Sequence, residues 1–386
     1  DFQSDGMVVT AFYSNGTSKT LDVKDYNVKP SKIVADTKKI TITYNGKTCE
    51  QKVTVVNENT IIVEDADGLM EVGNGLASSE TQKDYNRKTI LITKTINMEG
   101  ATWPVIMIND PLEYLAIKGY ENGITISDLK LTETTYTDAN NKTNHSSVGF
   151  IASTFSMKSL IIENITFEGL ETVTVNAGNS TTGVEDRNNN AVGAIIGYAG
   201  TSDEITISNC VVANGKIIGG HWAGGLVGYA AGYNTQTNGP VFQTLTLNNC
   251  SVQETKVSSK GSAGGLIGHA TGDYWTRDVF TGCTVIGCTI ESTGSSAVKA
   301  GSLMGTLGSG MTMYGHNGGV FITSCTVDDK TTATSNGIKI DRICGRQGSI
   351  GGVLNVDGEY LAFYYKSNET GAQTFSIEKL EKIEVS

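Results

Sequence analysis

Two short sequence patterns alternate along the chain, and this repetition is the feature that most constrains its fold. The first is a block that begins with a small or branched residue and a glycine and ends with two apolar residues and a glycine or alanine. Its copies are Val148–Ala152, Val192–Gly197, Ala223–Gly228, Ala263–Gly268 and Ala300–Gly305, with a decayed copy at Cys344 and Gly345. The second is the pattern apolar-x-x-Cys-x-apolar. Its cysteine position, which we call the slot, is occupied by Cys210, Cys250, Cys288 and Cys325. Such repetition predicts one structural unit stacked into a solenoid.

The second pattern predicts a bend between two short strands. Alternating apolar residues in a strand share one face, so a gap of three residues indicates a bend that redirects the inward face. Asn164, Asn209 and Asn249 directly precede the slot, and Asn tolerates the left-handed backbone that such a bend needs. The slot residues are therefore predicted to form an interior column, with Ile165 and Leu129 in the earlier copies. Phe280 and Cys283 offer a competing register for the copy at Cys288.

Composition agrees with many short strands joined by tight turns. The chain has 46 Gly and only 4 Pro in 386 residues, and long helical periodicity is nearly absent. We therefore predict an all-β fold, a right-handed single-stranded parallel β-helix. The later repeats carry longer segments between the glycine block and the cysteine slot, and insertions on one face of a solenoid often form its binding face.

Charge and cysteine content exclude several classes of function. The net charge of −11 makes nucleic acid an unfavourable partner. The 7 cysteines include no CxxC pair and no zinc-finger spacing, which disfavours a disulfide scaffold or a metal site. The cysteines of the slot are predicted to act as small apolar side chains. We expect no cofactor and no metal.

The glycine blocks Ala223–Gly228 and Ala263–Gly268 resemble the GLUG motif of bacterial surface adhesins and of the non-catalytic repeats of IgA-specific metallopeptidases. The resemblance covers residues 57–345. Residues 1–56, with the turn at Asn45 and Gly46, resemble a bacterial Ig-like domain, a small β-sandwich. Residues 346–386 are predicted to cap the open end of the solenoid. The resemblance implies a secreted protein or an outer-membrane lipoprotein at the cell surface, with peripheral or lipid-anchored membrane association.

Aromatic residues near the glycine blocks are the candidate ligand-binding residues. Tyr198, Tyr229 and His269 occupy equivalent positions just after three of the blocks, so they should line one surface of the stack. The inserted segments contain five more aromatic or imidazole side chains, those of Tyr233, Tyr274, Trp275, Tyr314 and His316. An exposed row of this kind could stack on sugar rings or anchor a protein partner. The alternative is that these side chains pack the insertions onto the coil.

Signatures of hydrolytic enzymes are missing from the sequence. The four histidines (His145, His221, His269 and His316) are far apart, so no zinc-peptidase motif exists, and there is no G-x-S-x-G or P-loop. The best acidic candidate is Asp273 with Arg277 and Asp278, for which a loop salt bridge is the alternative. Asp65, which hints at calcium, better fits the N-cap of a helix.

The sequence therefore predicts a non-enzymatic, adhesin-like protein that binds a glycan or a protein on a host or microbial surface. A carbohydrate-active enzyme on a β-helix scaffold is one alternative. A structural spacer for surface display is the other.

Overall fold

The computed structural model divides the chain into two compact units, Asp1–Thr60 and Ile61–Ser386. The sequence predicts this boundary at residue 56. The described residues are 7–31, 37–53, 55, 57–120, 123–137, 143–155, 157–173, 191–200, 202–230, 243–270, 276–294, 299–307, 319–340, 343–347, 354–357, 359–367 and 373–379. No helix in these ranges is long and apolar enough to cross a membrane.

The first unit contains two small antiparallel sheets. Their elements are β1 (Val9–Phe12) with β2 (Ser18–Leu21), the short 3-10 helix η1 (Val23–Asp25), and β3 (Asn27–Lys29), β4 (Lys39–Tyr44) and β5 (Lys47–Lys52). The side chains of Leu21, Tyr26, Ile40 and Ile42 form its buried core. Asn45 and Gly46 join β4 to β5 with φ values of 45° and 74°, which confirms the predicted two-residue turn.

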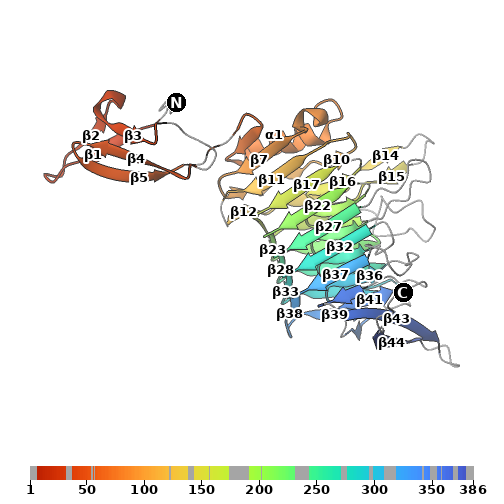
Figure 1. Cartoon of the computed structure of the whole chain (residues 1–386). Coiled ribbons are helices and arrows are strands. Elements are labelled where there is room, and N and C mark those ends of the chain that lie inside the picture. The colour runs from red at the N-terminus through yellow and green to blue at the C-terminus, as the bar shows by residue number, and fades with distance from the viewer. Residues whose placement is uncertain are drawn as a thin grey trace, which may run out of the picture. The chain divides into compact units, whose positions relative to one another are not determined.

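The second unit is a parallel β-helix whose coils stack along one axis (Figure 1). Each of the four turns from Ser159 to Leu307 passes through five sheets, which we call A to E in chain order, and one sequence repeat makes one turn. Sheet A contains β6 (Thr60–Val63), β7 (Lys88–Ile92), β11 (Leu115–Gly119), β17 (Ser159–Glu163), β22 (Glu204–Ser208), β27 (Gln243–Asn248), β32 (Thr276–Thr281), β37 (Gly319–Thr323), β42 (Leu354–Val356), β43 (Glu359–Ser367) and β44 (Gln373–Lys379).

The other four sheets follow sheet A around the turn. Sheet B contains β8 (Ile96–Asn97), β12 (Ile124–Ser127), β18 (Ile165–Glu168), β23 (Val211–Ala213), β28 (Ser251–Gln253), β33 (Thr284–Ile286) and β38 (Thr326–Val327). Sheet C contains β9 (Thr102–Trp103), β13 (Lys130–Thr132), β19 (Glu171–Val173), β24 (Lys216–Ile218), β29 (Lys256–Ser259), β34 (Thr289–Ser292), β39 (Thr332–Ser335) and β40 (Ile338–Lys339).

Sheets D and E complete the turn. Sheet D contains β20 (Ala191–Gly193), β25 (Trp222–Gly224), β30 (Ser262–Gly264) and β35 (Ala300–Gly301). Sheet E contains β10 (Met107–Ile108), β16 (Ile151–Thr154), β21 (Ile196–Ala199), β26 (Val227–Ala230), β31 (Ile267–Ala270), β36 (Met304–Leu307) and β41 (Cys344–Gln347). A separate antiparallel hairpin pairs β14 (Thr135–Thr137) with β15 (Thr143–His145).

The predicted interior column exists, but its register is wrong at two copies, those of Cys288 and Leu129. Ser251 pairs with Thr284 and Thr284 with Thr326, so Cys283, not Cys288, follows Cys250 in the column. The column therefore runs through Ile165, Cys210, Cys250, Cys283 and Cys325. Cys288 lies at the next corner, where its backbone accepts a hydrogen bond from Thr332, and Leu129 has the equivalent place in an earlier coil. A five-residue offset still puts a cysteine at a bend, which is why the sequence pattern alone did not distinguish the two.

The cysteines of the column act as apolar side chains. Burial raises the pKa of the Cys210 thiol to about 12, so this thiol stays protonated at neutral pH. Its neighbour in the preceding coil, Ile165, is equally buried. The residue before the column has a positive φ in each coil, 59° at Asn164 and 50° at Asn209, which confirms the predicted left-handed bend.

The glycine blocks mark the place where sheets D and E approach each other most closely. A Cβ on Gly224 would lie 1.9 Å from the carbonyl oxygen of Val227, and one on Gly228 would lie 2.5 Å from the backbone nitrogen of Val192. Backbone occupies both sides, so no larger residue fits without moving a strand. These glycines are needed for close approach.

Different elements cover the two ends of the β-helix. At the start, α1 (Ala66–Ala77) buries Leu69, Val72 and Leu76 against the first coil, and the 3-10 helix η2 (Gln82–Tyr85) follows. Asp65 caps α1 by accepting a hydrogen bond of 2.9 Å from the Gly68 N–H, which confirms its predicted role. At the other end, β43 and β44 extend sheet A in the antiparallel sense.

Candidate functional site

The equivalent aromatic residues after the glycine blocks form a stacked column on sheet E. Tyr198 pairs in register with Tyr229, and Tyr229 with His269. The ring centroids are 5.5 Å apart for the two tyrosines, and 4.5 Å apart with an interplanar angle of 4° for Tyr229 and His269. The predicted alignment is therefore correct, because in-register parallel strands place equivalent side chains directly above one another.

Three further rings join this column, and none of them is among the predicted ligand-binding residues. Trp222 on sheet D meets Tyr229 edge-on at 4.7 Å and His269 at 5.9 Å. His221 meets Trp222 edge-on at 4.6 Å, and Phe155 lies 5.6 Å from Tyr198. We call these six residues the aromatic cluster. A usable signal existed in the sequence, since Trp222 immediately precedes a glycine block and so begins a strand beside the column.

The aromatic cluster lies outside the main core, and its rings differ in exposure. Its two tyrosines form a separate apolar cluster with Ala191, against which Phe155 and Trp222 pack. Tyr198 and Tyr229 are only 8% and 2% exposed, so the expectation of a fully exposed row is wrong for them. His221, Trp222, His269 and Phe155 are half-buried. The tyrosines thus form a floor, and the four half-buried rings form the accessible rim.

His221 is uncharged at neutral pH. Burial, together with the positive charge of Lys299, lowers the pKa of His221 to about 4 from an ordinary 6.5. Its imidazole packs directly on the backbone of the next coil, because a Cβ on Gly261 would lie 2.9 Å from the His221 Cγ. The ring therefore contacts both Trp222 and the backbone at Gly261.

The remaining predicted ligand-binding residues fall outside the described part of the chain. These are Tyr233, Tyr274, Trp275, Tyr314 and His316, together with Asp273. The predicted aromatic set is therefore described only at Tyr198, Tyr229 and His269.

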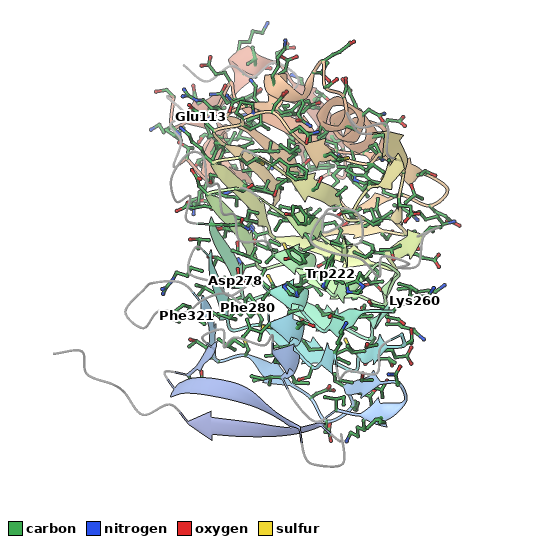
Figure 2. All side chains as sticks on the ribbon, turned by 90° about the vertical axis from the view of Figure 1, so that its right-hand side faces the viewer. Glu113, Trp222, Lys260, Asp278, Phe280 and Phe321 are labelled. Carbon is green, nitrogen blue, oxygen red and sulfur yellow. The ribbon has the colours of Figure 1, made fainter. Side chains whose placement is uncertain are left out.

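The acidic candidate around Arg277 and Asp278 does not form one site. The two residues are neighbours on β32, so their side chains point to opposite faces of sheet A. The guanidinium carbon of Arg277 lies 4.1 Å from the ring centroid of Phe321. Asp278 is 1% exposed and continues the inward column between Leu245 and Val320, on the same strand as the buried Phe280 (Figure 2). Strand alternation therefore separates Arg277 from Asp278, while Asp273, the third residue of the candidate, lies outside the described residues.

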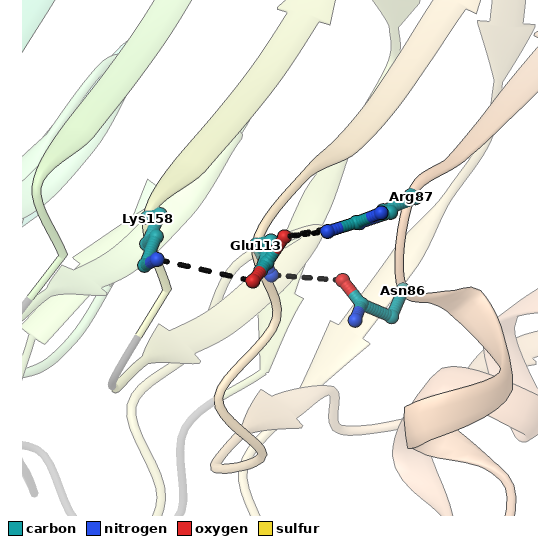
Figure 3. A network of polar contacts seen from close by, with 4 residues as sticks. All are labelled: Asn86, Arg87, Glu113 and Lys158. Carbon is teal, nitrogen blue, oxygen red and sulfur yellow. Dashed lines mark hydrogen bonds and ion pairs between the residues drawn. The ribbon is translucent and has the colours of Figure 1, made fainter.

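A second polar group lies in the segments that directly precede β7, β11 and β17 of sheet A (Figure 3). Arg87 donates to Glu113 from its Nε at 3.0 Å and also from Nη2, and Lys158 Nζ lies 3.9 Å from the other carboxylate oxygen. The Asn86 side chain accepts a hydrogen bond of 2.8 Å from the Glu113 N–H. Hydrogen bonding and charge from Arg87, then the charge of Lys158, lower the pKa of Glu113. The group is exposed and already satisfied by its own ion pairs, so it indicates surface stabilisation and not a ligand site.

The fold defines the class of protein: a parallel β-helix preceded in the chain by an Ig-like unit. Residues 1–55 match the bacterial Ig-like domain (group 3), which fits an extracellular or surface protein. A crystal structure named as a "putative immunoglobulin A1 protease from Bacteroides ovatus" is similar at 15% identity and a TM-score of 0.44, over 81% of this chain and 91% of that one. None of the curated protein sequences compared with the chain matches it.

Proposed function

We propose that this chain is a non-enzymatic extracellular or cell-surface protein that binds a surface glycan at the rim of the aromatic cluster. The observation that carries the proposal is the cluster itself, six rings on four successive coils outside the main core. A stable coil does not need these rings, because equivalent positions of sheet E hold Ser153 and Thr306.

The geometry of the rim suits sugar rings. Trp222 is held by edge contacts with three neighbours and remains half-buried, so it offers an ordered apolar surface. Large aromatic side chains supply contact area at a low cost in conformational entropy. Bacterial Ig-like domains support the extracellular location. The separation of Arg277 from Asp278 favours binding over the alternative of a carbohydrate-active enzyme.

A glycan array probed with the full chain tests the proposal, followed by titration of each hit. Trp222→Ala is expected to weaken binding at least 10-fold, while Trp222→Phe keeps most of it. Phe321→Ala is the matched control, since Phe321 is a half-buried ring on the outer face of sheet A. Equal binding by Trp222→Ala and the parent chain would refute the site. Release of reducing or unsaturated ends from a bound glycan would refute the non-enzymatic assignment.

A further inference from the structure

The charged residues that the structure describes on sheets D and E, and at the corner before sheet D, all have the same sign. The described residues 106–108, 148–155, 191–200, 219–230, 259–270, 292–294, 299–307 and 343–347 form sheets D and E and the corner that leads into sheet D. Within them the charged residues are Lys260, Lys299 and Arg346, and none is Asp or Glu. The whole chain, by contrast, has 40 acidic and 29 basic residues. Among the described residues, this face therefore carries only positive charges.

The register of the coils places these basic residues next to the aromatic rim. The outward column of sheet D runs from Trp222 to Ser262, and Lys299 follows, where its carbonyl accepts a hydrogen bond of 2.9 Å from the Ala263 N–H. Two coils separate Trp222 from Lys299, which is about 10 Å. The backbone of Arg346 pairs with that of Thr306 on sheet E.

Lys260 lies at the corner beside His221, one coil further along. Lys260 lies against the following coil at Gly294, where an added Cβ would be 3.0 Å from the Lys260 Cβ. Lys260 is exposed and forms no ion pair with a residue in the described ranges. Trp222 and Lys260 come from adjacent coils of the same face (Figure 2). The nearby lysines of sheet C differ, because Lys256 is paired with Glu291 at 2.9 Å and Lys216 with Glu171 at 2.7 Å.

We propose that the ligand of this face is an anionic glycan, with a sugar ring on Trp222 and its carboxylate or sulfate groups toward Lys260 and Lys299. This inference rests on the proposed function and specifies its ligand class. A ring platform flanked by cations fits a polymer that alternates apolar sugar faces with negative groups. The net charge of the chain, −11, repels an anionic polymer. Such binding must therefore come from the local cations of this face and not from the charge of the whole chain.

Binding of the full chain to three polymers with one common backbone tests this inference. The polymers are dextran, carboxymethyl dextran and dextran sulfate, measured by calorimetry at low and moderate salt. At least one anionic form is expected to bind 10-fold or more tightly than dextran and to weaken as salt rises. The double variant Lys260→Ala with Lys299→Ala is expected to lose at least 10-fold. Lys256→Ala, a paired lysine nearby, is expected to change affinity less than 2-fold.

The outcomes separate this inference from the proposed function. Equal binding of neutral and anionic dextran, lost in Trp222→Ala, would retain a glycan site and overturn the anionic assignment. An equal loss in Lys256→Ala would also overturn it, because the effect would then be one of net charge. Tighter binding of a single-stranded oligonucleotide than of either anionic dextran would overturn the glycan as ligand. Failure of all three dextrans, combined with a neutral hit on the array, overturns only the inference drawn here.

Discussion

Gln82 joins the capping helix to the first coil, and its replacement by Met should destabilise that end of the β-helix. The side chain is 3% exposed and bonds to four backbone groups. Its Nε2 donates to the carbonyl oxygens of Leu76 at 2.5 Å and Met107 at 2.9 Å. Its Oε1 accepts from the N–H groups of Asn109 at 2.9 Å and Asp110 at 3.0 Å. Leu76 lies in the last turn of α1, so Gln82 also satisfies a helix-terminal carbonyl.

The expected magnitude follows from these four bonds. Each buried hydrogen bond contributes about 1 kcal/mol net, and a polar group left buried without a partner costs about 1–3 kcal/mol. Gln82→Met keeps the length of the side chain but loses all four bonds, so we expect a loss of about 3–5 kcal/mol in the free energy of unfolding of the first coils. Lys83→Met, on the adjacent exposed residue, should change it by less than about 0.5 kcal/mol.

Hydrogen exchange measured by NMR is the appropriate assay, because the ends of a repeat protein can open separately from its middle. The amides of Asn109 and Asp110 donate to Gln82, so their exchange should accelerate at least 100-fold in Gln82→Met. Amides in central strands such as β22 should keep their protection. Unchanged exchange of the Asn109 and Asp110 amides, with an unchanged urea midpoint, would refute the reasoning.

Three further predictions concern the glycine block, the buried imidazole and the inward carboxylate. In a urea titration, Gly228→Ala should lower the free energy of unfolding by at least about 3 kcal/mol or prevent folding, because the new Cβ would lie 2.5 Å from the Val192 nitrogen. Gly68→Ala in α1 is the control and should leave the free energy of unfolding unchanged. The His221 pKa of about 4 lies below its unfolded value of 6.5, so the unfolded chain takes up the proton first as the pH falls. The free energy of unfolding should therefore be highest above pH 6.5 and fall by at most about 3 kcal/mol between pH 6.5 and pH 4. Thermal melts of His221→Gln should lack this pH-dependent loss of stability. Asp278→Val should raise the free energy of unfolding by about 1–2 kcal/mol, since apolar neighbours flank the carboxylate in its column, and a lower urea midpoint would contradict this.

Strand periodicity and turn chemistry were readable from the sequence because they depend on neighbouring residues. The bends at Asn164 and Asn209, the turn at Asn45 and the helix cap at Asp65 all follow from local backbone preference. The alignment of Tyr198, Tyr229 and His269 was also predictable, because a constant offset from each glycine block fixes the register. The parallel β-helix and the Ig-like unit follow from the same local signals.

Only the tertiary structure decided which faces those residues present and what lies across from them. The choice of Cys283 over Cys288 depends on the pairing of neighbouring coils, since both cysteines lie at bends and differ only in which corner they occupy. The burial of Tyr229 and the contact of Trp222 with it arise where two sheets meet, which no single repeat specifies. Sequence determines the conformation of each repeat, while contacts between repeats determine burial, partners and the charge of each face.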